Sequence, residues 1–152
     1  MTLSTLDTLD FDAFDEMMRV NVRGTFVVDE QALRRVRDGG AIINFSSSVV
    51  QRSVPTYAGY SASKAAIDAI ALILARELVG RVVTVNSLAP GPTATPMFLQ
   101  GKEQAVIDAI GAASALGRLG TPDDIAEVVS FLAGPAGRWT NSQVLYADGE
   151  LR

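Results

Sequence analysis

The first candidate for chemistry is a tyrosine followed four positions later by a lysine, Tyr60 and Lys64. Residues four apart on a helix lie one turn above another on the same face, so the phenol and the ammonium can point into one cleft. A free tyrosine has a pKa of about 10, and a cation one turn away favours its ionised form. The pair therefore predicts a general acid or base that exchanges protons with an alcohol or carbonyl compound at roughly pH 7 to 9. The alternative is coincidence, since a chain with so few tyrosines and lysines gives this spacing by chance roughly 4% of the time.

A serine supports the catalytic interpretation of this pair. Ser47 lies thirteen residues before Tyr60, at the end of a predicted strand, where open α/β sheets form their ligand crevice. Its hydroxyl could donate a hydrogen bond to the same substrate oxygen. The alternatives are turn chemistry at a strand end, and a hydrolytic dyad made by Ser47 and Lys64.

The composition excludes several other chemistries. The 152 residues include no cysteine and no histidine, so there is no thiolate, no zinc-thiolate site and no histidine base. The net charge is -4 and the cations are scattered, which argues against nucleic acid as a partner. Any proton transfer must use tyrosine, lysine or a carboxylate.

The sequence also predicts a soluble, cytoplasmic protein. The segment Met1–Met18 is acidic and has no basic flank before an apolar stretch, so it is not a secretory signal. The longest apolar run, Ala65–Ala75, is interrupted by Asp68 and is shorter than the ~20 residues that cross a bilayer. We therefore expect no membrane partner.

Strands that alternate with helices must position these side chains. This order is typical of βαβ units, a parallel sheet and a single domain over 1–152. Pro90 and Pro92 are expected to end the second strand because proline cannot join a ladder. The predicted helices are Asp10–Arg37 (one or two in series), Tyr57–Val79, one around Glu103–Ile110 and Thr121–Ala133, and the predicted strands are Ala41–Phe45, Arg81–Leu88 and Gln143–Ala147.

Seven motifs occur in an order that resembles the short-chain dehydrogenase/reductase family over essentially the whole chain. They are Val20–Phe26, Ile42–Ser47, Tyr60–Lys64, Val85–Gly91, Thr95–Met97, Gly117–Ala126 and Asp148-Gly149. The resemblance implies a partial Rossmann-like three-layer sandwich, with a parallel sheet and helices on both faces, that lacks the first βαβ units. It also implies hydride transfer between a nicotinamide cofactor, NAD or NADP, and a small carbonyl or alcohol substrate.

The resemblance implies a role for each of four side chains. Tyr60 would be the acid or base, and Ser47 would polarise the substrate oxygen. Lys64 would bind the nicotinamide ribose hydroxyls and lower the pKa of Tyr60. Asn21 would hold a proton-relay water, although a helix-surface amide or one that fills a kink is the alternative.

A loop after the second strand resembles the segment that contacts the nicotinamide carboxamide. There the resemblance assigns cofactor contacts to Pro90, Gly91, Thr93 and Thr95, in addition to Tyr60 and Lys64. Proline stiffness and a small glycine would let backbone amides approach a ligand. The alternative is that Pro90 and Pro92 only end the strand and begin a loop, with no contact to a cofactor.

The sequence departs from the family pattern at the cofactor phosphates. Nothing in the chain matches the glycine-rich turn that follows the first strand and receives the pyrophosphate, so about the first ninety residues of the family fold are expected to be missing. The strand Ala41–Ser46 would then have one unpaired edge, which favours association. We expect a homodimer or homotetramer formed by the helices around Thr25 and Ile70, which resemble the helix-bundle dimer interface of the family.

Two functions follow from these observations. The first is an oxidoreductase of this family, and the second is a non-catalytic remnant that serves as an oligomerisation or interaction module. The resemblance implies that the segment from Pro96 to Leu116 is a lid that largely sets the substrate pocket, and its apolar side chains predict an apolar carbonyl or alcohol substrate.

Overall fold

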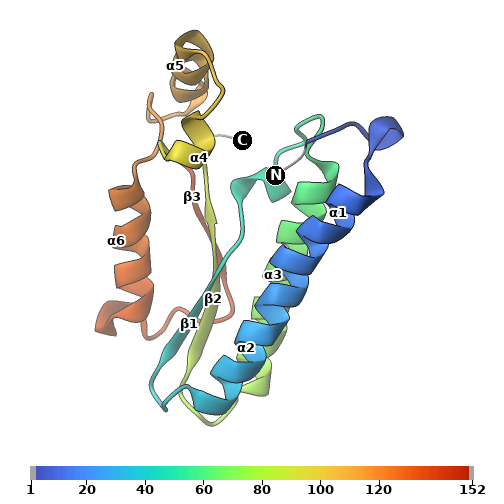
Figure 1. Cartoon of the computed structure of the whole chain (residues 1–152). Coiled ribbons are helices and arrows are strands. Elements are labelled where there is room, and N and C mark those ends of the chain that lie inside the picture. Colours follow the sequence, from blue (N-terminus) through green and yellow to red (C-terminus); the bar gives the residue numbers. More distant parts are fainter. Residues whose placement is uncertain (1–2, 151–152) are drawn as a thin grey trace.

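The computed structural model describes residues 3–150 and shows three layers around a parallel sheet. Its helices and strands are α1 (Phe11–Met18), α2 (Gly24–Arg35), β1 (Ala41–Phe45), α3 (Ala58–Glu77), β2 (Thr84–Pro90), α4 (Pro96–Leu99), α5 (Gln104–Ala113), α6 (Pro122–Ala133) and β3 (Val144–Ala147). The strands follow the order β1-β2-β3, and both neighbouring pairs are parallel. The sheet lies between α6 and the layer formed by α1, α2 and α3 (Figure 1). The predicted α/β fold with helices on both faces is confirmed.

The first strand has the predicted bounds, whereas the second does not. β2 was expected at Arg81–Leu88 and begins at Thr84, because Val82 takes a φ of 55°, a left-handed conformation that no strand contains. At its other end β2 includes Pro90, which pairs with Ala147 of β3. The missing N–H of Pro90 costs no ladder bond, because the pairing of β1 with β2 ends at Leu88.

The main core lies between α3 and the sheet. Val85 of β2 and Val83, which directly precedes this strand, both belong to this core. Ala71 is fully buried there, and its small side chain allows the helix to approach the strands closely. The core cluster consists of Ile42, Ala71, Leu74, Ala75, Leu78, Val83 and Val85.

The predicted amino-terminal helix is two α-helices joined by a π-helical turn, Arg19–Arg23. The Asp10 carboxylate caps α1 by accepting hydrogen bonds from the N–H groups of Asp12 and Ala13. α2 ends at Arg35, two residues earlier than predicted, because Val36 adopts an extended conformation. The helix that covers the sheet beside α3 is thus continuous but not regular.

The carboxyl end of α2 is stabilised by an arginine from the turn before β2. The Arg81 guanidinium donates one hydrogen bond to the Leu33 carbonyl at 2.8 Å and another to the Val36 carbonyl. It also pairs with Asp38, with 3.1 Å between Nε and Oδ1. A cation at this position satisfies terminal carbonyls and opposes the negative end of the helix dipole.

The other face of the sheet is covered by α6, which begins as predicted. Thr121 and Asp124 form a capping box, and Pro122 occupies the first turn. Between β2 and α6 the chain forms α4 and α5 with connecting loops, and α4 was not predicted. A single β-bridge between Thr93 and Gly120 holds the two ends of this segment together.

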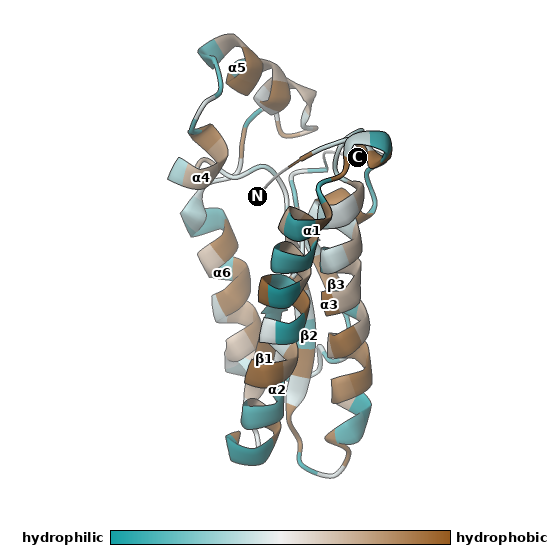
Figure 2. Cartoon of the chain, turned by 45° about the vertical axis from the view of Figure 1, so that its right-hand side comes forward, coloured by the Kyte–Doolittle hydropathy of each residue, from teal (hydrophilic) through white to brown (hydrophobic). Residues whose placement is uncertain are grey.

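The helix α3 is apolar along much of its length (Figure 2). By length and composition α3 could cross a membrane, but a core helix of a soluble protein passes the same test. This span was not predicted from the sequence, because only the apolar run Ala65–Ala75 was considered and not the whole helix Ala58–Glu77. In the structure α3 packs against β1 and β2 through a buried face that includes Ile67 and Leu74.

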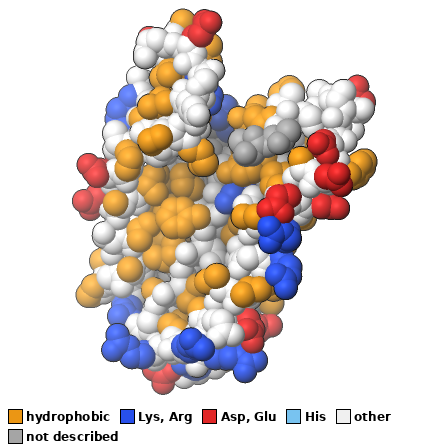
Figure 3. Space-filling model, in the orientation of Figure 1, with side chains coloured by type: hydrophobic (Ala, Val, Ile, Leu, Met, Phe, Trp, Pro, Cys, Tyr) orange, Lys and Arg blue, Asp and Glu red, His pale blue; other side chains and the backbone are white. Residues whose placement is uncertain are grey.

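Apolar side chains remain exposed on the outer faces of the helices and beside β1. Phe26 and Val28 on α2 and Ile73 on α3 are 57%, 65% and 61% exposed. Phe45, in β1, is also exposed, and β1 pairs only with β2 among the described residues. Hydrophobic side chains gather in a hollow between α6 and the α1–α3 layer (Figure 3).

We predict that Arg81→Met lowers the free energy of unfolding by about 1 to 3 kcal/mol, because it leaves two helix-end carbonyls without their charged donor. Chemical denaturation followed by circular dichroism measures this change.

The matched control is Arg34→Met, which removes an exposed ion pair with Glu30 and should change stability by about 0.5 kcal/mol or less. Equal losses in the two variants would contradict the assigned role of Arg81.

Candidate active site

The tyrosine and lysine of the predicted pair lie together at the amino-terminal end of α3. Tyr60 is in the first turn of the helix and half-buried, with its ring edge-to-face against Tyr57 at 6.2 Å between centroids. The Lys64 ammonium lies 5.8 Å from the centre of the Tyr60 ring. The helix therefore places a phenol and a cation side by side, as the spacing predicts.

Ser47 follows β1 and reaches the same place from the sheet. Its backbone is extended, and its hydroxyl accepts a weak hydrogen bond from the Val49 N–H at 3.4 Å, at the start of a 3-10 turn. The Ser47 side chain also forms a hydrogen bond with Tyr60, which lowers the pKa of that phenol. The turn role and the site role of Ser47 thus coexist.

The expected lowering of the Tyr60 pKa by Lys64 is not found. Burial raises the pKa of Tyr60 above its ordinary value, outweighing the hydrogen bond from Ser47. The Lys64 ammonium donates a hydrogen bond to the carbonyl of Phe45, the last residue of β1, at 2.9 Å. Helical spacing correctly brought the two residues together, but it did not determine where the flexible lysine would direct its charge.

The pKa of Lys64 is itself perturbed. Burial lowers the pKa of this ammonium, and the negative charge of Asp68, one turn further along α3, raises it in opposition. Asp68 is 9% exposed and was not singled out in the sequence as part of the site. Its position four residues after Lys64 was the available signal.

Asn21 lies in the π-helical turn and contacts α3. Its side-chain amide donates a hydrogen bond to the Ser63 hydroxyl at 3.0 Å, and Ser63 donates in turn to the Tyr60 carbonyl at 2.8 Å. Ser63 is fully buried, and the sequence interpretation did not include it. π-helical turns are rare and occur frequently at functional sites. The amide both fills an irregular turn and ties that turn to the helix of Tyr60, while a water relay stays a prediction.

The four loop residues assigned to the cofactor lie at the carboxyl end of β2. Gly91 approaches Asp148 so closely that an added Cβ would lie 2.6 Å from the Asp148 Cα, so a glycine is needed here by packing alone. Thr93 donates to the Gly91 carbonyl at 2.9 Å, and Thr95 caps α4. Pro90 and these residues thus have structural roles, and their contacts with a cofactor stay predictions.

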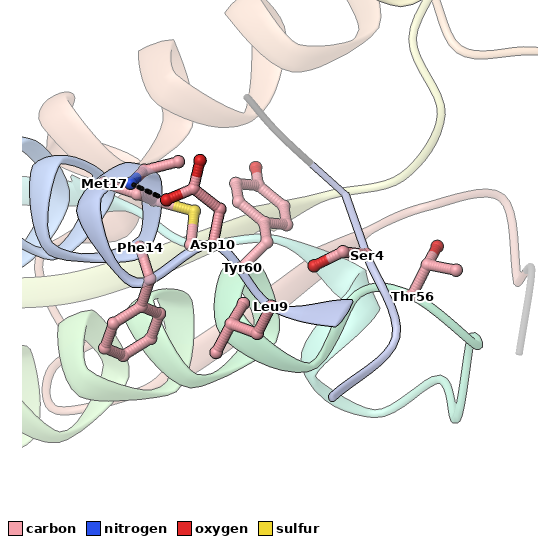
Figure 4. Close-up of a pocket in the computed structure, with 9 residues that line it drawn as sticks. Ser4, Leu9, Asp10, Phe14, Met17, Thr56 and Tyr60 are labelled. Carbon is pink, nitrogen blue, oxygen red and sulfur yellow. Dashed lines mark hydrogen bonds between the residues drawn. The ribbon is translucent and has the colours of Figure 1, made fainter. Parts of the chain in front are cut away.

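One hollow borders Tyr60, and a second lies along α5. A small pocket with a volume of about 10 Å³ is walled partly by Tyr60, next to Leu9 and Asp10 (Figure 4). A larger open groove of about 400 Å³ runs along α5. It is lined by one cation and five apolar side chains, namely Arg52, Ala105, Val106, Ala109, Ile110 and Ala113. Between residues 3 and 150 no three acidic side chains are grouped to hold a metal ion.

Comparison with known proteins gives a consistent result over nearly the whole chain. Residues 2–150 match the family described as Enoyl-(Acyl carrier protein) reductase. The chain is 43% identical over 148 residues to NADPH-dependent aldehyde reductase 2, chloroplastic, of Arabidopsis thaliana, covering 96% of this chain and 54% of that protein. It is 42% identical over 147 residues to a short-chain type dehydrogenase/reductase of Picea abies, covering 95% and 54%.

Solved structures agree with these sequence relationships. The structure of angucycline C-6 ketoreductase LanV with bound NADP superposes with a TM-score of 0.91 at 35% identity, covering 99% of this chain and 58% of that one. The chain therefore spans little more than half the length of the proteins it matches.

We predict that Ser47→Ala moves the titration of Tyr60 to higher pH, because it removes the hydrogen bond that lowers the pKa of the phenol while leaving the burial that raises it. Absorbance at 295 nm during an alkaline titration, with Tyr60→Phe as the reference trace, isolates this transition.

The control is Ser61→Ala, next to Tyr60 in the chain, whose hydroxyl is directed to the Val49 carbonyl. It should leave the Tyr60 transition in place, and an unchanged transition in Ser47→Ala would rule out the proposed contact.

Proposed function

Because this chain belongs to the short-chain dehydrogenase/reductase family, we propose that it carries the catalytic part of an NAD(P)-dependent oxidoreductase that reduces a small apolar carbonyl compound to an alcohol. The observation that carries this proposal is the convergence of Tyr60, Ser47 and Lys64 at the carboxyl end of β1. The same edge of the sheet is where open parallel sheets bind their ligands.

Tyr60 is proposed as the general acid. Burial keeps its pKa above the ordinary value, so the phenol holds its proton at neutral pH and can donate it to a carbonyl oxygen. When bound, the nicotinamide supplies the hydride that reaches the carbonyl carbon. A protonated tyrosine suits reduction better than oxidation, since the reverse reaction needs a base in the same position.

Ser47 and Lys64 would orient the reactants. The Ser47 hydroxyl is within hydrogen-bonding reach of Tyr60, so one substrate oxygen could contact both side chains. The Lys64 ammonium has three N–H donors and uses one on the Phe45 carbonyl, which leaves two for the ribose hydroxyls of a cofactor. These donors fit the nicotinamide end of NAD or NADP. The names of two similar proteins refer to NADPH or NADP, which favours NADP.

The groove along α5 is the proposed place for the substrate body. Three alanines, one valine and one isoleucine offer an apolar wall beside the single cation Arg52, which suits an apolar aldehyde or ketone. Similar proteins are named as an aldehyde reductase and a ketoreductase, which supports a carbonyl substrate.

We further propose a soluble, cytoplasmic homodimer or homotetramer. The exposed apolar side chains of α2 and α3, including Phe26 and Ile73, provide a surface that association would bury.

Phe26→Asp should convert the assembly into monomers of 16.1 kDa, because it places a charge in the apolar contact. Size-exclusion chromatography with light scattering gives the mass, and a wild-type protein that is already monomeric would contradict the proposed assembly.

The activity proposal is tested by titrating NADPH and NADH into the chain and following nucleotide fluorescence and calorimetric heat. Lys64→Ala should weaken NADPH binding about tenfold or more, since a charged hydrogen bond contributes about 1.5 to 3 kcal/mol. Tyr60→Phe should bind NADPH but lose carbonyl reduction.

Lys102→Ala is a close control, because Lys102 also lies over an aromatic ring and donates to a backbone carbonyl, yet belongs to the segment after α4. It should bind NADPH as the wild type does. No binding at millimolar nucleotide by the folded chain would reject the proposal and favour an interaction module.

A further inference from the structure

Two buried carboxylates lie in the layer between the helices and the sheet, and the proposed reaction uses neither. The Asp68 carboxylate, on α3, accepts a hydrogen bond from the Ser87 hydroxyl on β2 at 2.5 Å. The Asp29 carboxylate, on α2, accepts one from the Asn44 amide on β1 at 2.7 Å. Asn44 and Ser87 are direct register partners in the sheet. The two acids are therefore anchored on adjacent strands in the same polar layer.

The two acids differ in their relation to the site. Asp68 lies one helical turn from Lys64 on the face that also carries Tyr60, so the three side chains form one row along α3. Taking a carboxylate and an ammonium out of water is costly unless each has a compensating partner. Asp68 supplies that compensation for Lys64, because burial lowers the pKa of Lys64 and the negative charge of Asp68 raises it.

We propose that Asp68, anchored by Ser87, is a positioning residue that keeps the side chain of Lys64 in its ammonium form at the site. The Ser87 hydrogen bond that holds Asp68 and the position of Asp68 one helical turn from Lys64 carry this inference without reference to a reaction. Its consequence for catalysis rests on the proposed function, since only a charged Lys64 has all its N–H donors for a cofactor.

No other buried charge on the surrounding elements can take this role. β1, β2 and the 3-10 turn Ser48–Val50, which pack against α3, contain no ionisable side chain. On α3 itself the nearest titratable neighbour is Tyr60. α2 contributes Asp29, whose pKa is raised by burial, a shift toward its neutral form. The charges of α1 and the π-helical turn are exposed to solvent, namely Asp12, Asp15, Glu16, Arg19 and Arg23.

The chain offers a direct measurement, because its sequence contains only two lysines, Lys64 and Lys102. Labelling lysine with ¹³C at the carbon next to the amine gives two side-chain signals, which Lys102→Arg assigns. Each signal moves as its amine loses a proton, so the titration of Lys64 can be followed in the intact chain with no cofactor or substrate.

Asp68→Asn should shift the Lys64 titration to lower pH, because the amide keeps the shape of the side chain and removes its charge. Asp29→Asn is the matched control, since it makes the same change in a buried acid with one sheet partner, and its Lys64 titration should coincide with that of the wild type. If Asp68→Asn does not fold by circular dichroism, Asp68→Leu, a second uncharged side chain of similar size, should give the same downward shift.

A second measurement connects this role to the proposed function. Asp68→Asn should weaken NADPH binding about tenfold at high pH and less at low pH, where Lys64 stays charged. Absence of NADPH binding in every variant would count against the proposed function and leave the lysine titration as an independent result. A Lys64 titration that is unchanged in folded Asp68→Asn, or that falls equally in Asp29→Asn, would overturn the inference.

Discussion

The close packing of α3 on the sheet is the contact on which the rest of the site depends. Its apolar face, with Ala71 and Leu74 at the centre, lies against Val85 and fixes the helix along β1 and β2. The first turn of α3 then extends to the edge where β1 ends. Tyr60 and Lys64 reach Ser47 and Phe45 only because that docking sets the position of the helix to within the reach of a side chain.

Burial has opposite consequences for the two ionisable groups at this edge. Burial disfavours the charged form of each group. It raises the pKa of Tyr60, which keeps its proton, and lowers the pKa of Lys64, which loses its proton more easily. The first effect suits an acid, while the second would remove the cation on which cofactor binding is proposed to depend. A carboxylate placed one turn away in the core resolves this conflict, and Ser87 gives that carboxylate a fixed partner.

Much of the fold could be predicted because the residues that begin or end helices and strands, and the spacing of apolar residues within them, are local properties of the sequence. Glycines precede β1, and Thr121 with Pro122 begins α6, so both elements were located well. β2 was placed too early because β-branched Val82 favours strands, although its backbone turns there. The four-residue helix α4 is too short to show a helical period.

Spacing could identify the site residues but not the final contacts of their side chains. Long-range partners decide those contacts, as with the Phe45 carbonyl that receives Lys64 and the Ser63 hydroxyl that receives Asn21 across 42 positions. A pattern confined to one helix contains no information on either partner. In the sequence, the buried Asp68 was visible as an interruption in an apolar run and as an acid four residues after Lys64.

The π-helical turn has a consequence for the geometry of the whole helical layer. A turn closed by i→i+5 bonds, here from the Gly24 N–H to the Arg19 carbonyl, contains one residue more than an α-helical turn. Each α-helical residue advances the chain by about 100° around the axis, so the extra residue rotates α2 relative to α1 by about that angle. Phe14 can therefore face α3 while Asp29 faces β1, although both belong to one continuous rod. Deleting a single residue from this turn would restore a regular helix and turn Asp29 away from Asn44. The extra residue therefore sets the angle between the face of α1 that contacts α3 and the face of α2 that contacts β1.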